Sequence, residues 1–260
     1  MNTRRCIGMV LAVGIALSCC GCAAIMEGNK AQKVMTGGVD EKGNFISDQK
    51  IMTLAQPDDL ELYRKLLPSQ FDMPKHPLVG LVVVDYVEVR PWPFTRYLEG
   101  YIVLRASYRG EEGWHCIFMP VTKRVAMWGG RKMGFPKYIA DRITLAPDGD
   151  GWRGEVFHDG TSRLLLTFTP GEVKEEPVYL REKWDLGGPV FQLNPPAKGP
   201  AVQVVKSSEL GKPEIKTTYG YVSVTIGAAE HGAGLVKPGT ILPGMFEKKT
   251  GGNGVLKPGA

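Results

Sequence analysis

The chain has 260 residues and a formal net charge of +5, with 32 Lys and Arg residues against 27 Asp and Glu residues. The two signs are interspersed and no basic stripe of the kind that binds nucleic acid is present, so we expect no nucleic-acid partner. The length suits one β-rich domain with a substantial core better than two small domains.

The first 22 residues have the features of an export signal. Two arginines give a positively charged start, and the apolar stretch 7–17 is too short to span a bilayer as a mature helix. A short run of cysteines and small residues follows, as in bacterial lipoprotein signals. We expect lipidation at Cys22, with Cys19 as the alternative. An ordinary secretory signal with incidental cysteines is the other interpretation.

Lipidation at Cys22 predicts a protein of the cell envelope that its N-terminal lipid holds to a membrane. Ala23, rather than an aspartate, follows this cysteine, which favours the periplasmic side of the outer membrane. After cleavage at this position Cys116 is the remaining cysteine, so we expect no disulfide within the chain and a buried, apolar role for its thiol.

Two segments near the N-terminus have distinct patterns. Residues 23–50 are polar and contain glycine, which predicts a flexible tether between the lipid and the fold. Asp58 and Glu61 have the spacing of a capping box, which predicts a helix over residues 59–67 that ends before Pro68.

From residue 81 the hydrophobic period changes to two, which is typical of β-strands. Turns rich in glycine and acidic residues, such as 109–113 and 147–151, separate the apolar segments. Consecutive strands are therefore expected to pair as antiparallel meanders that close into a barrel or sandwich. The predicted strands are residues 81–89, 99–108, 114–121, 138–145, 152–157, 163–168 and 217–226.

The composition changes again after residue 226, where glycine, lysine and proline become frequent. We predict that residues 246–260 form a disordered tail. The folded domain is then expected to cover residues 51–245.

The segment Gly134-Phe135-Pro136-Lys137 carries the strongest chemical signal. The proline fixes its own φ and the glycine permits a tight bend, so the lysine is expected at a stiff corner among apolar neighbours. An amine held among apolar groups loses hydration, which lowers its pKa and makes a lysine a nucleophile that forms a Schiff base with a ketone. A surface lysine at the start of an ordinary strand is the alternative.

This motif resembles that of the acetoacetate decarboxylase family, in which the lysine forms a Schiff base. The similarity continues, in the same order and rough spacing, through further segments and covers roughly residues 50–225. It implies a mainly β (α+β) fold, namely an antiparallel, cone-shaped, β-barrel-like domain with a few peripheral helices. The further segments are residues 63–68, 77–79, 97–100, 110–114 and 117–121.

The resemblance also implies roles for individual residues. Lys137 corresponds to the nucleophile, and Glu99 to a carboxylate that faces it and moves protons. We expect four residues to contribute to substrate binding, namely Arg131, Phe135, Tyr138 and Met119. Arg96 and Arg105 are further candidates for pairing with the acid group of a substrate. The four histidines are scattered without metal-ligand spacing, so we expect no metal, and we expect no cofactor.

Several positions depart from the family pattern. Tyr138 stands where the family has a second lysine, and Lys132 where an acidic residue usually follows the arginine. Asp85 is the nearest candidate for a second carboxylate, out of register by about two positions. Lys50 lies close to the expected place of an arginine.

Three functions remain open from the sequence. The first is a Schiff-base-forming lyase that decarboxylates a small keto acid through Lys137 and Glu99. The second is an aldolase-dehydratase that uses the same imine. The third is a non-catalytic lipoprotein that binds an apolar small molecule. Assembly into a homo-oligomer is also left open.

Overall fold

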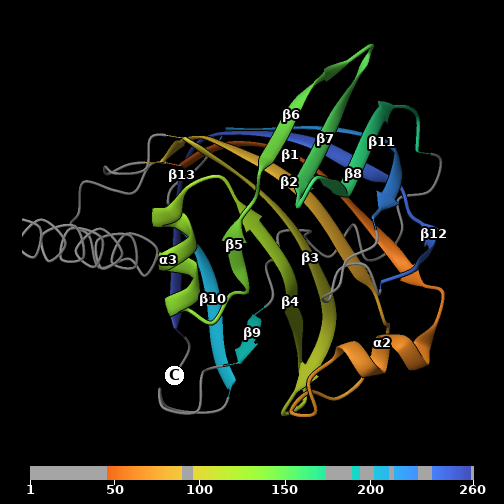
Figure 1. Ribbon diagram of the computed structural model, residues 1–260, viewed down its shortest axis with the longest axis vertical. Coiled ribbons are helices and arrows are strands. Elements are labelled where there is room, and N and C mark those ends of the chain that lie inside the picture. Colours follow the sequence, from red (N-terminus) through yellow and green to blue (C-terminus); the bar gives the residue numbers. More distant parts are fainter. Residues whose placement is uncertain are drawn as a thin grey trace, which may run out of the picture.

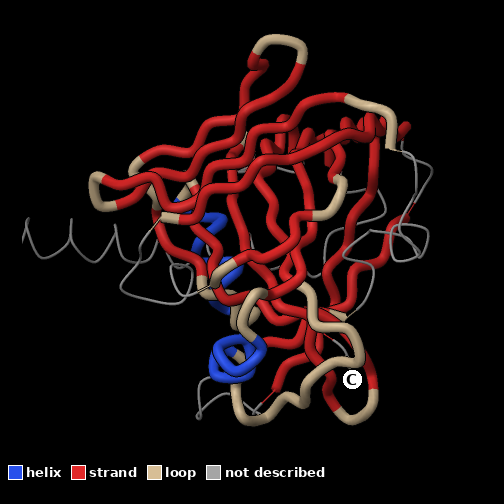
Figure 2. Tube along the Cα trace, turned by 90° about the vertical axis from the view of Figure 1, so that its right-hand side faces the viewer, coloured by secondary structure: helices blue, strands red, loops and turns tan. Residues whose placement is uncertain are grey.

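The computed structural model describes residues 46–89, 96–173, 189–193, 202–210, 214–227 and 236–258. Strands make up most of this part of the chain, with two helices beside them (Figure 1, Figure 2). The expected signal segment, with Cys19 and Cys22, lies outside the described residues. Among those residues no helix is long and apolar enough to cross a membrane.

The two helices are α2 (Leu60–Leu66) and α3 (Arg124–Lys132). The strands follow in chain order as β1 (Ile46–Pro57), β2 (Val79–Val89), β3 (Tyr97–Tyr108), β4 (Glu111–Val121), β5 (Lys137–Ile139), β6 (Arg142–Asp148), β7 (Gly151–His158), β8 (Thr161–Pro170), β9 (Val190–Leu193), β10 (Val202–Leu210), β11 (Glu214–Ile226), β12 (Pro238–Ile241) and β13 (Gly244–Pro258).

The thirteen strands of the described residues belong to one mixed sheet that closes on itself. The strand order is β12-β1-β2-β3-β4-β9-β10-β13-β11-β8-β7-β6, and β13 also pairs with β1. The path β1-β2-β3-β4-β9-β10-β13 is therefore a closed ring of paired strands. Most neighbours are antiparallel, as predicted, whereas β4 pairs in parallel with β5 and with β9. The predicted mainly β, barrel-like fold is confirmed, with these parallel pairs as additions.

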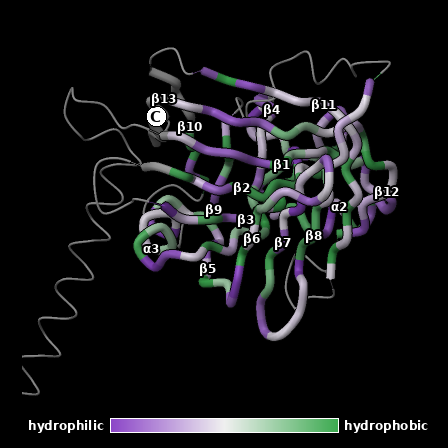
Figure 3. The backbone as a smooth tube through the Cα atoms, turned by 90° about the horizontal axis from the view of Figure 1, so that it is seen from above, coloured by the Kyte–Doolittle hydropathy of each residue, from purple (hydrophilic) through white to green (hydrophobic). Residues whose placement is uncertain are grey.

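Strands β6, β7 and β8 continue the sheet from β11 and pack back across the ring. A Cβ added to Gly154 of β7 would lie 2.8 Å from Cβ of Val83 on β2, and one added to Gly100 of β3 would lie 2.3 Å from Cγ2 of Val156 on β7. Glycine at these positions lets β7 approach β2 and β3 closely. In Figure 3 hydrophobic segments gather in the part of the molecule where β7 and β8 lie.

The alternation of side chains along the ring strands separates two cores. The larger core joins one face of the ring to the β6–β8 layer and includes Leu81, Val83, Ile102, Leu104, Val156, Leu164, Leu166 and Phe168. The other face, here called the inner face, contributes to a second cluster from each of the seven ring strands. Its members include Met52, Val82, Val84, Tyr101, Val103, Cys116, Met119, Val190, Val205 and Met245.

The predicted first helix is present with a small shift. The backbone N–H of Leu62 donates to Asp59 Oδ1 at 2.9 Å, so Asp59 is the N-cap rather than Asp58. The helix α2 ends at Leu66, before Pro68, as expected. The helix α3 was not predicted, because its sequence contains two adjacent glycines, which are poor helix formers.

The structure corrects three predicted boundaries. Residues 246–258, predicted as part of a disordered tail, continue β13, which pairs with β1, β10 and β11. Residues 46–50, predicted as the end of the tether, begin β1. The strand predicted over 138–145 is divided into β5 and β6. The prediction of a tail used only the residue types of the segment itself. A glycine- and lysine-rich segment can still be a strand when neighbouring strands supply its backbone hydrogen bonds.

Candidate active site

Lys137 begins β5 directly after a tight turn. Gly134 has φ +81°, a conformation that suits glycine, and a Cβ there would lie 2.9 Å from Cβ of Gln192 on β9. The turn brings Lys137 opposite Met119 of β4 in parallel register. The stiff corner expected from the Gly-Phe-Pro-Lys motif is present, and it places the lysine on the inner face of the ring.

Lys137 and Glu99 form a buried ion pair on this face. Lys137 Nζ donates to Glu99 Oε2 at 2.5 Å, and each side chain is only 3% exposed. The two residues are 38 positions apart in sequence and come from β5 and β3. Two charges removed from water are tolerated when they are paired, so each group depends on the other. A proton can pass between them over a single hydrogen bond.

The helix α3 packs directly on the lysine. A Cβ on Gly130, in its last turn, would lie 2.3 Å from Lys137 Cδ and 2.5 Å from Cε. The aliphatic part of the Lys137 side chain therefore packs against the backbone of α3 at Gly130, where the helix has no side chain. Arg131, the next residue of α3, is exposed and its Nε donates to the backbone oxygen of Lys137 at 2.5 Å. In this arrangement Arg131 holds the backbone of the lysine.

Three tyrosines lie around the pair, of which Tyr97 and Tyr101 are buried and Tyr86 is half-buried. The Tyr97 ring centroid lies 5.8 Å from Lys137 Nζ, and the ring stacks on Tyr86 with centroids 4.6 Å apart. Tyr97 and Tyr101 precede and follow Glu99 by two residues on β3, so all three share the inner face. Burial raises the pKa of each tyrosine well above its ordinary value. The negative charge of Glu99 adds to the effect. All three hydroxyls are therefore protonated and neutral.

Two of the predicted substrate-binding residues lie in the inner-face cluster together with Tyr101. Met119 lies beside Lys137, and Phe135 precedes it by two residues; both are buried in the inner-face cluster. Tyr138 lies on the opposite face, where its ring contacts Phe118 at 5.9 Å and His158 at 4.6 Å between centroids. Burial raises the pKa of Tyr138 to about 12. The position that carries a second lysine in the family thus points away from the Lys137 amine here.

The other candidate arginines are engaged elsewhere. Arg96 donates to Asp85 through Nε at 3.0 Å and Nη2 at 2.7 Å, and Arg105 Nη2 lies 2.7 Å from Glu112 Oε2. Asp85 lies opposite Leu98, whose side chain packs on the larger core, so it faces away from Lys137. The sequence-based candidate for a second carboxylate is therefore on the wrong face of the sheet.

A different carboxylate, Asp48 of β1, occupies the inner face. It is 8% exposed and lies opposite Tyr86. Its charge contributes to the raised pKa of Tyr86, Tyr97 and Tyr101. Lys50, two residues further on the same face, lies 2.8 Å from Glu247 and 3.8 Å from Asp48. Lys50 was noted from the sequence as lying close to the expected place of a family arginine, whereas Asp48 was missed because residues 23–50 were predicted to form a tether.

One group among the described residues has the composition of a metal site. Asp141, His158 and Asp159 offer ligand atoms within 4.8 Å of one another. The two ring nitrogens of His158 face different carboxylates, Nδ1 at 3.8 Å from Asp141 and Nε2 at 3.4 Å from Asp159. Arg163 also lies 3.9 Å from Asp159. These ion pairs join Asp141, directly before β6, to His158 and Asp159 at the β7–β8 turn.

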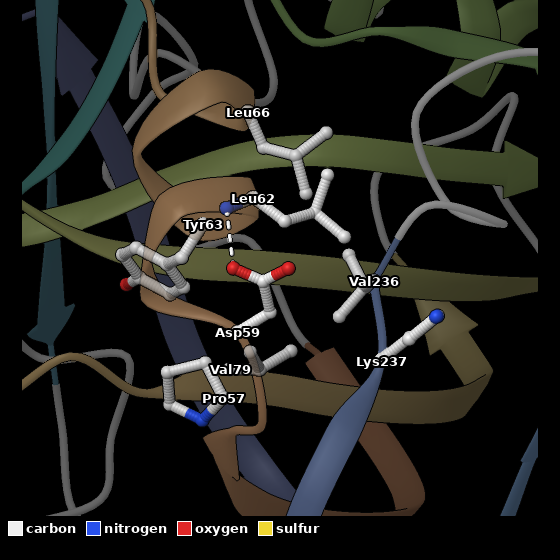
Figure 4. A pocket seen from close by; sticks show the side chains of 8 residues that line it. All are labelled: Pro57, Asp59, Leu62, Tyr63, Leu66, Val79, Val236 and Lys237. Atoms are coloured by element: carbon white, nitrogen blue, oxygen red, sulfur yellow. Dashed lines mark hydrogen bonds between the residues drawn. The ribbon is translucent and has the colours of Figure 1, made fainter.

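A small open hollow lies elsewhere, against α2 (Figure 4). The N-cap Asp59 and its hydrogen bond to Leu62 form part of its wall. Its lining includes neither Lys137 nor Glu99, so it is distinct from the buried pair. The residues that line it are Pro57, Asp59, Leu62, Tyr63, Leu66, Val79, Val236 and Lys237.

Comparison with solved structures places the fold. The crystal structure of acetoacetate decarboxylase (ADC) from Legionella pneumophila subsp. pneumophila str. Philadelphia 1 is similar with a TM-score of 0.65 and 21% identity, over 84% of this chain and 86% of that one. The enduracididine biosynthesis enzyme MppR complexed with pyruvate gives a TM-score of 0.60 and 15% identity, over 84% and 91%. An acetoacetate decarboxylase-like enzyme from Sphingomonas wittichii RW1 gives 0.59 and 15%, over 85% and 94%.

The sequence comparisons carry the family assignment. The comparison with curated proteins gives no match. The sequence profile described as acetoacetate decarboxylase (ADC) matches residues 35–206, which include both Glu99 and Lys137. The ring of strands, the buried lysine and this match agree, and the chain belongs to the acetoacetate decarboxylase (ADC) family.

Proposed function

We propose that the protein is a Schiff-base-forming lyase that acts on a small keto acid. The observation that supports this most directly is the buried pair in which Lys137 Nζ lies 2.5 Å from Glu99 Oε2. A lysine held at a stiff turn, covered by α3 and paired with a single carboxylate has the parts that imine chemistry needs, namely a nitrogen nucleophile and an adjacent proton carrier.

The residues suggest the following sequence of steps. Lys137 transfers a proton to Glu99, and the free amine adds to the ketone carbon. Loss of water, with a proton returned by Glu99, gives a protonated imine next to the Glu99 carboxylate. In a β-keto acid such as acetoacetate, the imine withdraws the electron pair of the bond between its neighbouring carbon and the carboxylate, so carbon dioxide leaves and an enamine forms. Protonation of the enamine carbon and hydrolysis release the product and restore Lys137.

The same imine can also support an aldolase-dehydratase reaction, which the experiment tests separately. Tyr138 replaces the second lysine of the family and its ring packs on the opposite face of the sheet. A site altered in this way is compatible with an aldolase-dehydratase, in which the enamine adds to an aldehyde and no carbon dioxide is lost. One MppR structure is complexed with the condensation product of pyruvate and imidazole 4-carboxaldehyde.

Borohydride trapping tests the proposal. The protein without residues 1–22 is incubated with acetoacetate, pyruvate and other small keto acids, reduced, and mapped by mass spectrometry. We expect a reduced adduct at Lys137, its loss in Lys137→Ala, and its retention in the control Lys123→Ala at the exposed start of α3. Carbon dioxide release indicates decarboxylation; aldehyde consumption without it indicates the aldol reaction. A folded protein with no adduct across the panel would point to a binding lipoprotein.

We also propose that the protein is exported and anchored by a lipid at Cys22 to the periplasmic side of the outer membrane. Support comes from the positively charged start, the apolar stretch and the small residues before this cysteine. Metabolic labelling with a radioactive fatty acid tests it. Labelling should be lost in Cys22→Ser and kept in Cys19→Ser; the reverse result would move the lipid to Cys19.

A further inference from the structure

The hydroxyl of Tyr101 is a polar group that the chemistry above does not yet use. Tyr101 is 6% exposed and lies in the inner-face cluster with Met119 and Phe135. Within the described part of the chain, no hydrogen bond involves its hydroxyl. The buried hydroxyl of Tyr63, by contrast, donates to the carbonyl oxygens of Leu78 and Arg105. The Tyr101 oxygen is not one of the fully enclosed side-chain atoms that lack a partner in the described residues, so it keeps some accessible surface and is open to a hydrogen-bond partner from a ligand.

The register of the strands places Tyr101 in the same row as the reactive lysine, two strands away from it. Strands β3 and β4 are paired at Ile102 and Phe118, so the preceding residue Tyr101 lies opposite Met119. Met119 in turn lies opposite Lys137 of β5. The three side chains therefore form one row across adjacent strands of the inner face, and strands in such a row are about 4.8 Å apart.

The same residue is also a neighbour of the carboxylate. Tyr101 follows Glu99 by two positions on β3, which puts both side chains on one face. Glu99 contributes, after burial, to the raised pKa of Tyr101, which agrees with this placement. The hydroxyl therefore keeps its proton and is a neutral hydrogen-bond donor on the face of the sheet that carries both Lys137 and Glu99.

We propose that Tyr101 is a further catalytic residue, whose hydroxyl donates a hydrogen bond to the carbonyl oxygen of the substrate while Lys137 adds to the carbonyl carbon. This proposal rests on the proposed imine chemistry. It gives the unpaired hydroxyl an acceptor that is present only when substrate is bound. The substrate class is a small carbonyl compound whose oxygen reaches the row formed by Lys137, Met119 and Tyr101.

The ammonium group of Lys137 first passes one of its three protons to Glu99. The resulting free amine forms the C–N bond with its lone pair, and the carbonyl π pair moves to the oxygen. Tyr101 gives its proton to this oxygen and takes one back from the nitrogen, which leaves a neutral carbinolamine and an unchanged phenol. The nitrogen lone pair then forms C=N, and hydroxide leaves with the Glu99 proton as water. The products are the iminium, the Glu99 carboxylate and one water molecule.

The test compares Tyr101→Phe with the wild type and with Tyr108→Phe, which removes the same atom near the other end of β3. Each protein is mixed with acetoacetate or pyruvate, and timed samples are quenched with borohydride for intact-mass measurement. We expect Tyr101→Phe to form the adduct about 100-fold more slowly, as for loss of one donor to a developing oxyanion. The Tyr108→Phe protein should match the wild type.

Urea unfolding shows whether a slower adduct formation in Tyr101→Phe is caused by the lost hydroxyl or by a loss of folded protein. Tyr101→Phe removes a hydroxyl that has no hydrogen bond to lose, so its urea midpoint should equal or exceed that of the wild type. If this folded variant forms the adduct as fast as the wild type, the role of Tyr101 is overturned and the imine chemistry stands. If the wild type itself forms no adduct, the proposed function and the role of Tyr101 fall together.

Discussion

A Cβ placed on Gly130 would lie 2.3 Å from Cδ of Lys137, so the last turn of α3 and the stem of the lysine share a space that has no room for a methyl group. In other helices an alanine would be the better residue at such a position. We therefore explain the presence of glycine at position 130 by the space that the Lys137 side chain needs, because glycine itself is a poor helix former. This relationship can be separated from ordinary helix propensity by experiment.

Gly130→Ala should displace Lys137 from Glu99 and abolish most imine formation. The effect on stability should depend on residue 137. In the wild type the new methyl group overlaps the lysine and destabilises the fold, whereas in a Lys137→Ala background the same change should stabilise it by about 0.5–1 kcal/mol. Urea unfolding of the four proteins measures the coupling. Equal effects of Gly130→Ala in both backgrounds would contradict the packing described here.

The Lys137–Glu99 ion pair predicts that removal of one charge destabilises the fold more than removal of both charges. Lys137→Met leaves Glu99 buried without its cation, and removal of one partner of a buried pair is destabilising by about 3–5 kcal/mol. The double variant Lys137→Met/Glu99→Leu removes both charges and should recover most of that loss. Chemical denaturation at neutral pH compares the three proteins. A double variant no more stable than Lys137→Met would show that the buried charge is not the cause.

Parts of this fold could be predicted because they depend on local sequence. The turns at Gly110, Gly149 and Gly160 all have positive φ, and each joins the pair of strands expected from its turn residues. The ring closure could not be predicted in this way. It depends on β13, which pairs with β1 across about 200 positions of sequence, and its segment has the composition of a tail.

The candidate site also contains residues that local sequence could predict and residues that it could not. The turn chemistry of Gly134 and Pro136 pointed to Lys137, and the resemblance to the family pointed to Glu99. Asp48 was missed because a short polar segment gives no sign of which face of a strand it will occupy. Tyr138 was placed at the site by its sequence neighbourhood, whereas strand alternation turns adjacent residues to opposite faces.

Arg131 offers a way to separate positioning from substrate binding. Its Nε donates to the backbone oxygen of Lys137, so Arg131→Gln should loosen the turn that holds the lysine. We expect a lower kcat with little change in KM for any keto acid that the enzyme accepts. A raised KM with unchanged kcat would instead assign Arg131 to binding of the substrate carboxylate, as the family resemblance implies. Steady-state kinetics of the two proteins decide between these outcomes.

His115 predicts how stability depends on pH. Its Nδ1 lies 2.9 Å from the backbone oxygen of Phe191, which can only accept, so the neutral ring carries its proton on Nδ1. Burial lowers the pKa of His115 below its ordinary value of 6.5. As pH falls below about 6.5 the unfolded chain gains a proton that the folded protein does not yet bind. The free energy of unfolding should therefore decrease toward acid pH, until the folded protein also takes up the proton.

The matched variant is His115→Asn, whose side-chain amide can still donate near the Nδ1 position but does not titrate. Urea unfolding between pH 5 and pH 8 gives the free energy of unfolding of both proteins, and contributions from other titrating groups cancel in the difference. The wild type should lose stability relative to the variant as pH falls, by at most about 1.4 kcal/mol per pH unit for one proton. Parallel curves would mean that His115 binds its proton equally well in the folded and unfolded states, and would contradict the lowering of its pKa by burial.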